Sequence, residues 1–490
     1  MTLRSIIPQS YKVPGTYIKV SLGVGPRSSG DSARQVVLFG NKIAAGTMNV
    51  ATEYDCLSID DARVLAGPGS ELFCMAQAVF DANSSTTLKL IAIAESAGTA
   101  ATATGVFTGT ATAGGTVGVS VLGREIEIGY SAGATATVVA QAAADAVNGE
   151  VDWPVVAVGT TGTITVTAKN KGPRGNFIAM RVRIIDGQGI TVVGPVTGYL
   201  TGGATSDDPL AALDTIATVR RRYLVAPYSD AAQLAKFRAH VDAEEEPLVG
   251  HRKWCLFGSL DTLGVTTTLT TGINFPRMQC VWQEKSDYTP GMNAAAFAAL
   301  RAYEESSDAA HNFDGQVIAG LKPHYDKGTI PTSNELDSAL NHGITPLSST
   351  NAGDVICIRS ITTKFQDGAG VPDYRVLDTH KVTVADEIAD RFESEFGARF
   401  AGFKASDDPP DDKPPAPGVC TPALCEDLAF ELLIIAEEND GLLQLGSVEQ
   451  RKDEVIFELS TVSQGRFNGV VPIDVVELAH QFCVDVRQVG

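Results

Sequence analysis

Basic residues are scarce in this chain of 490 residues. Lysine and arginine together number 38, whereas aspartate and glutamate number 58, so the formal net charge at pH 7 is −20. Proteins that bind nucleic acids normally carry a basic surface and have a high isoelectric point. The charge balance therefore argues against a nucleic-acid-binding protein, although a local basic patch would not show in these totals.

Long apolar runs are also missing. The longest helical apolar stretch, Leu428 to Ala436, contains Glu431 and is well below the roughly 18 residues that a membrane span requires. The segment Met1 to Ser10 holds one arginine and a single short apolar pair, a pattern that predicts no signal peptide. We therefore expect no membrane insertion.

Motifs that would hold a cofactor or a metal are absent or incomplete. None of the 7 histidines stands four residues from another, which is the spacing of a helical metal site. The acidic run Asp407 to Asp412 contains prolines and lacks the glycine of a calcium loop, so we interpret it as a solvated loop. Gly25 to Ser32 has the glycine spacing of a Walker A loop, but Asp31 occupies the position of the phosphate-binding lysine. No Gly-x-Gly-x-x-Gly sequence follows a predicted strand, and we expect no cofactor and no metal.

Strand and helix patterns alternate in two separate parts of the chain. Residues 33–95 begin with a buried strand pattern, Gln35 to Gly40, and continue with two helix patterns and a second strand. The same alternation resumes over residues 204–380, with strand patterns at Arg222 to Tyr228 and Lys253 to Gly258. Both parts together predict one Rossmann-like α/β layer with a mostly parallel sheet.

The intervening residues 96–203 have a different composition, rich in glycine, alanine, threonine and valine. Short alternating runs separated by turn residues predict an inserted all-β, sandwich-like outer domain that also contains one helix, Thr135 to Asn148. The low-complexity stretch Ala97 to Gly114 is also compatible with a linker.

One sequence in this insert matches the nucleophile elbow of α/β hydrolases, Gly129 to Gly133 with Ser131 at its centre. An elbow serine requires a buried central strand beneath it and a histidine at its hydroxyl. The preceding strand pattern, Glu125 to Tyr130, is half exposed, and the nearest histidine in sequence is His240. A glycine-rich turn explains the match better, and a hydrolase stays the distant alternative.

Each end of the chain carries one predicted strand. Thr16 to Leu22 alternates between apolar and polar residues, and the polar, glycine-rich residues 23–32 follow it, so residues 1–32 read as an arm and its tether. Near the other end, Phe482, Val484 and Val486 alternate with polar residues. Such strands can complete the sheet of a neighbouring subunit. The residues predicted to make these contacts between subunits are Thr16, Tyr17, Ile18, Lys19, Val20, Phe482, Val484 and Val486.

Residues 381–490 predict an α+β assembly domain. Val384, Ile388, Phe392, Phe396 and Phe400 form an apolar, core-facing stripe on one helix. The strand predicted at Glu454 to Thr461 is expected to pair with Gln481 to Val489, and a short helical turn is expected at Val475 to His480. Because two strands are marginal alone, we expect arms of neighbouring subunits to complete this sheet.

Five short segments follow one another along nearly the whole chain: Val13 to Tyr17, Gly202 to Thr205, Gly343 to Leu347, Arg359 to Thr363, and Gly465-Arg466 with Val470 to Pro472. In their order and spacing the sequence resembles the tail sheath proteins of contractile bacteriophages, in particular the Mu-like type. The resemblance implies a non-enzymatic virion subunit, assembled in the host cytoplasm, that forms stacked hexameric rings and contracts to drive a tail tube into a host. It implies as partners other copies of the chain and the tail tube, baseplate and tail-terminator proteins. A phage-derived injection or secretion particle is the alternative setting.

Six of the 8 cysteines fall into two groups. Cys255, Cys280 and Cys357 lie within apolar strand patterns and are expected to be core residues. Cys420 and Cys425 lie beside a proline-rich loop, and Cys483 lies on the predicted terminal strand. If the family resemblance holds, the finished particle leaves the reducing cytoplasm. Cys420, Cys425 and Cys483 are then candidates for a disulfide between subunits.

Overall fold

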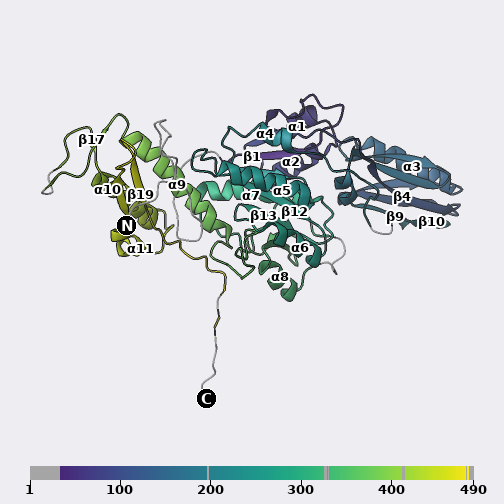
Figure 1. The fold of residues 1–490 in the computed structure, drawn as a ribbon. Coiled ribbons are helices and arrows are strands. Elements are labelled where there is room, and N and C mark those ends of the chain that lie inside the picture. The colour runs from purple at the N-terminus through teal and green to yellow at the C-terminus, as the bar shows by residue number, and fades with distance from the viewer. Residues whose placement is uncertain are drawn as a thin grey trace, which may run out of the picture.

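A computed structural model describes residues 34–195, 198–324, 328, 330–410, 414–481 and 483–484. It is elongated, with a β-rich part, a central α/β part and a C-terminal part in a row (Figure 1). The predicted N-terminal strand, Thr16 to Leu22, lies outside the described residues, as do Phe482 and Val486.

One eight-stranded sheet forms the centre of the molecule. Its order is β15 (Val355–Cys357), β14 (Ile344–Ser349), β13 (Met278–Trp282), β12 (Trp254–Ser259), β11 (Tyr223–Ala226), β1 (Val36–Gly40), β3 (Leu88–Ala92) and β2 (Glu53–Cys56). The six inner strands run parallel, and the two edge strands β15 and β2 are antiparallel to their neighbours. This arrangement agrees with the mostly parallel sheet that the strand and helix patterns predict.

Helices cover both faces of this sheet. On one face, Val36, Leu38 and Val225 pack with α1 (Ile59–Ala66), α2 (Glu71–Ala82) and α7 (Pro290–Ser307). On the other face, Val37 and Phe39 pack with α4 (Leu210–Asp214), α5 (Ala231–Glu244) and α6 (Leu263–Ile273). Strands that are buried on both faces read as continuous apolar runs, which is why the sequence shows them clearly. A further helix, α8 (Ser333–Leu340), begins with a capping box and precedes β14.

The chain leaves the large sheet after β3 and returns to it at β11. The strands between them form a four-stranded antiparallel sheet and a three-stranded one. The first has the order β10 (Ile190–Val193), β4 (Ala100–Gly109), β8 (Thr163–Lys171), β7 (Val155–Thr160), and the second β6 (Arg124–Tyr130), β5 (Gly115–Val121), β9 (Met180–Asp186). Helix α3 (Ala136–Gly149) packs against them, and a 3-10 turn, η1, spans Pro173–Phe177. The linker interpretation of Ala97 to Gly114 is wrong, because β4 alternates buried alanines and Phe107 with exposed threonines. Whether residues 96–203 are a separable domain stays a prediction.

The β-rich part is joined to the α/β part by buried charge. Arg174 of η1 forms an ion pair with Asp207 through one terminal guanidinium nitrogen. Its other terminal nitrogen lies 3.1 Å from the carboxylate of Glu71. Arg174 also lies over the ring of Tyr228, 4.7 Å from the ring centre. Removing the β-rich part would therefore leave Glu71 and Asp207 buried without their cation.

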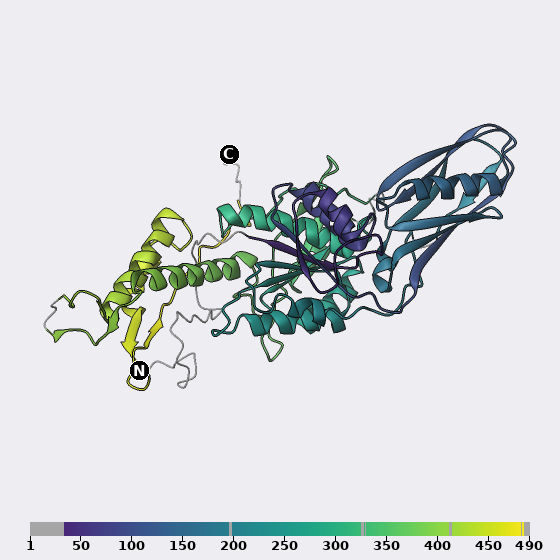
Figure 2. The ribbon, with the colours of Figure 1, turned by 90° about the horizontal axis from the view of Figure 1, so that it is seen from above.

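Helix α9 (Thr379–Arg399) runs from the large sheet into the C-terminal part, as Figure 2 shows. The expected apolar stripe faces a core: Ile388, Phe392, Phe396 and Phe400 pack with α10 (Pro422–Ile434), whereas Val384 packs with Leu442. The C-terminal part also contains β16 (Lys404–Ala405), β17 (Val419–Cys420), the π-helical turn η4 (Ile435–Asn439), α11 (Ser447–Gln450), η5 (Lys452–Glu454), β18 (Ile456–Leu459) and β19 (Phe467–Val470). Within the described ranges, no helix combines the length and the apolar character needed to cross a membrane.

The C-terminal part differs from expectation in its turns and in the partner of β18. Strand β18 pairs with β19 as an antiparallel hairpin, and Gln481, Cys483 and Val484 lie in no strand. The other residues of Gln481 to Val489 lie outside the described residues, so a pairing of β18 with them stays a prediction. The short turn at Gly465, where φ is 70°, brings β19 to β18 at a smaller loop-closure cost than a distant segment would require. Val475 to His480 forms no helical turn, because Val475 instead makes an isolated bridge to Leu443.

Candidate assembly interface

The hairpin of β18 and β19 presents an open sheet edge. The backbone N–H of Phe457 donates to the Glu426 carboxylate at 2.9 Å, so this part of the outer edge of β18 is already covered by α10. Along an antiparallel strand, N–H groups point alternately toward the partner strand and away from it. Since the N–H of Phe457 points away from β19, the N–H of its partner Gly469, and that of Phe467 two residues before, point to the outer edge of β19. No other strand in the described part of the chain pairs there. Unpaired edge groups of this kind are a template for strand addition.

Apolar side chains lie exposed around the same hairpin. Val470, Ile456 and Val462 are 47%, 45% and 65% exposed, and nearby Leu445 is 80% exposed. The inner face of the hairpin is anchored, because the Phe457 ring stacks on Phe396 of α9 at 5.7 Å. The hairpin is thus held on one side and unpartnered on the other.

The segment before the predicted C-terminal arm is held along α9. His480 Nδ1 lies 2.5 Å from Asp314, and its Nε2 lies 3.5 Å from Asp378, the residue that begins α9. These carboxylates raise the pKa of His480 above its ordinary value, although burial opposes them. Beyond it, Cys483 and Val484 are exposed and lie in no strand. His480 is therefore the root of this arm.

Arg34, the first described residue after the predicted N-terminal arm, is bound to the same helix. Its guanidinium lies 2.7 Å from Glu387 of α9 and 3.3 Å from Glu305 of α7, and all three side chains are buried. Both arms are therefore rooted at α9, one near the first turn of the helix and the other near its middle.

Arg34 belongs to a buried cluster that we call the ionic joint. Its cations stand just before parallel strands, and its carboxylates lie on α9. The members are Arg34 before β1, Arg222 before β11, Arg252 before β12, Arg277 before β13, and Asp386, Glu387 and Asp390. The N-terminal edge of the large sheet is thereby docked on α9.

Distances in the ionic joint are short, and its side chains are buried. Asp386 lies 2.6 Å from Arg277 and 3.5 Å from Arg222, and Asp390 lies 2.6 Å from Arg252. Burial alone would raise the pKa of Asp386, but the charges of Arg277 and Arg222 outweigh it and hold this pKa below its ordinary value. Burial raises the pKa of Glu387 to about 7, against the attraction of Arg34 and Arg222. Paired charges at this depth fix the orientation of the helix relative to the sheet.

Sequence reasoning missed both the ionic joint and β19. A basic residue immediately before successive strand patterns, and acidic residues at positions 386 and 390 of one helix, are the signals that could have revealed the joint. The hairpin edge was missed because Phe467 to Val470 contains a glycine, which weighs against a strand.

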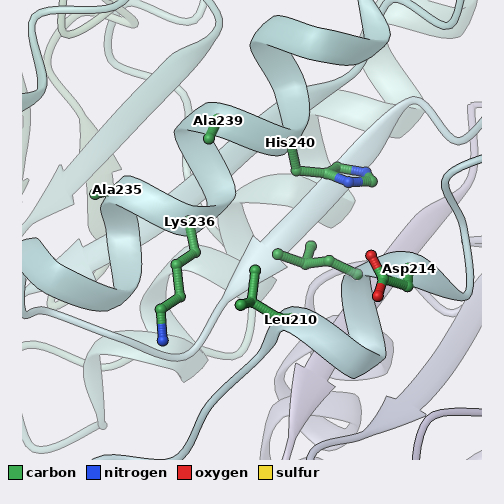
Figure 3. A pocket seen from close by; sticks show the side chains of 7 residues that line it. Leu210, Asp214, Ala235, Lys236, Ala239 and His240 are labelled. Atoms are coloured by element: carbon green, nitrogen blue, oxygen red, sulfur yellow. The ribbon is translucent and has the colours of Figure 1, made fainter.

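A groove of about 420 Å³ lies between α4 and α5. Leu210, Leu213 and His240 line it, and Figure 3 shows Leu210 and His240 approaching it from the two helices. Burial and the neighbouring Lys253 lower the pKa of His240 to about 4, so the imidazole is neutral at pH 7. Lys236 at its rim is paired with Asp208 at 3.0 Å. No serine, threonine or cysteine is among the residues that line the groove beside this histidine.

The hydrolase alternative lacks its geometry. Ser131 is exposed and follows β6, an edge strand of the three-stranded antiparallel sheet, whereas an elbow serine follows a buried central strand. In the part of the chain that the structure describes, no group of three histidine, cysteine, aspartate or glutamate side chains could hold a metal ion.

The three cysteines proposed for a disulfide between subunits differ in position. Cys420 and Cys425 are buried and face each other, with 3.4 Å between their sulfurs, whereas Cys483 is exposed. A bond from any of them to a neighbouring subunit stays a prediction. The strand contacts predicted for Thr16 to Val20, Phe482 and Val486 lie outside the described residues, and Val484 is 79% exposed.

Known proteins resemble this chain in sequence and in fold. The chain is 25% identical over 407 residues to the Mu-like prophage FluMu tail sheath protein of Haemophilus influenzae, and the alignment covers 82% of each chain. The resemblance to Mu-like tail sheath proteins is confirmed. A chain of the anti-feeding prophage baseplate, determined by cryo-electron microscopy, has the same fold, with a TM-score of 0.51 and 12% identity over 98% of this chain and 99% of that one. A sheath tail protein from Listeria innocua aligns with a TM-score of 0.49 and 12% identity over 92% of this chain and 94% of that one. No family model matches the sequence.

These comparisons support a structural sheath function for the chain. The relative in Haemophilus influenzae carries the name of a tail sheath protein, and the match extends over most of both chains. The mixed α/β fold with several sheets is likewise shared with the anti-feeding prophage chain.

Proposed function

We propose that this chain is the subunit of a contractile tail sheath that polymerises as stacked hexameric rings around a tail tube. Contraction of the lattice would drive the tube through a host envelope, and the chain itself would catalyse no covalent reaction. The observation that carries the proposal is the match to a tail sheath protein over 82% of both chains. A chain with this fold in a six-fold symmetrised baseplate supports ring assembly.

Strand exchange would hold the rings together. An arm strand of a neighbouring subunit, carrying Thr16 to Val20 or Phe482, Val484 and Val486, would add to the outer edge of β19. The exposed side chains of Val470 and Ile456 support this proposal, because an added strand would cover apolar surface as well as unpaired backbone groups. Since both arms are rooted at α9, the ionic joint would set the distance over which they reach.

The proposed partners are other copies of the chain, the tail tube protein, and the baseplate and tail-terminator proteins. Assembly would take place in the host cytoplasm, and the product would be part of the virion. Residues 96–203 would form the outer domain, which projects from the central α/β part in Figure 1.

Truncation of the arms tests this proposal. Deleting residues 1–22, or residues 481–490, should leave a soluble folded subunit but abolish long tubes in electron micrographs. Val20→Pro should shorten the tubes in a milder way because proline removes one backbone donor, whereas Val20→Thr keeps the donor and serves as the matched control. Full-length sheaths from either truncated protein would contradict strand exchange.

A phage-derived injection or secretion particle is the second candidate. The likeness to the anti-feeding prophage chain favours it as an alternative setting for the same sheath function. Electron microscopy of particles from the native source separates the two, because a phage tail carries a DNA-filled capsid and an injection particle does not.

A further inference from the structure

Two buried thiols in the C-terminal part lie in direct contact. Cys420 ends β17, and Cys425 lies in the first turn of α10, five residues further along. Their sulfurs are 3.4 Å apart, and the side chains are 4% and 2% exposed. A disulfide needs about 2.05 Å between sulfurs, so closing the gap requires an approach of only about 1.4 Å.

We propose that Cys420 and Cys425 are a built redox site that forms a disulfide within one subunit. The backbone around both residues is already ordered: the carbonyl of Cys420 accepts from Ser406 at 3.1 Å, and the N–H of Cys425 donates to the Thr421 carbonyl at 3.1 Å. Bonding therefore needs side-chain rotation and leaves β17 and α10 in place. The burial of both cysteines favours a bond inside the subunit over a bond to a neighbouring subunit.

The chemistry proceeds by thiol–disulfide exchange with a small disulfide such as oxidised glutathione. Burial raises the pKa of Cys420, but the contact with the Cys425 thiol lowers it in part, so Cys420 is the thiol that deprotonates more readily. Local opening around β17 first exposes the buried Cys420 sulfur. The Cys420 thiolate then attacks one glutathione sulfur, and one glutathione thiolate leaves. Cys425 then loses its proton and attacks the Cys420 sulfur, which releases the second glutathione. Two electrons and two protons pass to glutathione, and one S–S bond forms in the protein.

The bond would tie the end of β17, which pairs with β16 at Lys404 and Ala405, to α10. It would also fix the first turn of α10, the helix whose Glu426 holds the backbone of β18. That the bond forms outside the cell rests on the proposed function, because only a particle outside the reducing cytoplasm meets such oxidants. The ability of the two thiols to form the bond does not rest on that function.

Mass spectrometry of the full-length chain tests the proposal. The reduced protein is incubated with oxidised glutathione, alkylated without reduction and digested. The peptide that contains both cysteines should carry no alkyl group and should be lighter by two hydrogen atoms than the reduced form. The exposed Cys483 is the internal control, and it should appear alkylated or joined to glutathione.

The rate supplies a second readout. It should fall about tenfold for each unit by which the pH is lowered, since only the thiolate attacks. In Cys425→Ser the remaining Cys420 should become alkylated or joined to glutathione. Full alkylation of both cysteines in the folded wild-type protein after long incubation would overturn the proposal. So would a bond from either cysteine to a second subunit.

Discussion

Replacing Asp386 by asparagine should weaken the ionic joint without changing its shape. The Asp386 side chain is fully buried and lies 2.6 Å from Arg277 and 3.5 Å from Arg222. Asparagine has the same size but carries no charge, so both guanidinium groups would lose a partner that they cannot replace with water.

The expected cost follows from what remains around each cation. Removing one partner of a buried ion pair costs about 3–5 kcal/mol, because the other charge stays buried without compensation. Arg222 keeps Asp390 at 3.7 Å and Glu387 at 3.8 Å, and Arg277 keeps Glu245. We therefore expect a loss near the lower limit, about 3 kcal/mol in the free energy of unfolding of the α/β part.

Tryptophan fluorescence during urea unfolding measures this loss. Trp254 and Trp282 are buried in β12 and β13 of the large sheet, and Trp254 lies at the strand end that carries the joint, whereas Trp153 lies in the β-rich part. A Trp153→Phe background restricts the signal to the large sheet. Subunits that lack residues 1–22 keep the measurement free of assembly.

The matched control is Glu431→Gln. Glu431 pairs with Arg399 at 3.2 Å, also at α9, but both side chains are about half exposed. An exposed pair contributes at most about 1 kcal/mol. If Asp386→Asn costs no more than this control, the ionic joint does not hold α9 to the sheet, and the reasoning is refuted.

Three further predictions concern the hairpin, the arm root and the β-rich part. Gly469→Ala would place a methyl group 2.4 Å from the Phe457 ring, so it should destabilise the hairpin by about 1–3 kcal/mol and shorten the sheaths seen by electron microscopy. The control is Gly465→Asn, at a left-handed position that faces open space. Equal sheath lengths for the two variants would contradict the prediction. Because the pKa of His480 is raised in the folded protein, its contribution to holding the arm root is complete below about pH 6.5 and is lost as pH rises through the folded pKa. Proteolysis between residues 474 and 484 should therefore become faster with rising pH. The same pH dependence in His480→Gln would exclude this role. Replacing residues 96–203 by a short Gly/Ser join, with Glu71→Gln and Asp207→Asn to neutralise the two orphaned carboxylates, should spare assembly. Loss of all polymerisation would show that this part belongs to the lattice.

The α/β layer could be predicted from the sequence because burial on both faces leaves an unmistakable pattern. Strands such as Val36–Gly40 and Trp254–Ser259 are buried at every position, so each appears as a short apolar run between polar segments. In the β-rich part, β4 alternates strictly, with buried residues at every second position. Each of these signals is local, and local signals survive without knowledge of the tertiary structure.

Strand pairing and the ionic joint could not be predicted in the same way. Strand β18 could have paired with any extended segment, and only the turn at Gly465 selects β19. Arg222 and Arg277 stand at strand ends, where charged residues are normally solvated, and their burial depends on α9, which begins more than 100 residues later. Sequence periodicity carries no information about which distant helix covers the end of a sheet.

The composition of the ionic joint bears on how a sheath subunit would move. A buried ion pair stabilises a fold no better than well-packed apolar residues would, and it often does so less well. What charges add is direction, because Asp386 and Asp390 meet Arg277 and Arg252 in one register of α9 along the sheet, and a shift of one turn would leave buried charges unpaired. Both arms are rooted on this helix. In the proposed lattice, an error in the angle of α9 would be passed to each neighbour through its arms. We infer that the joint keeps the subunit rigid, so that contraction changes the packing between subunits and leaves the geometry of the arm roots unchanged.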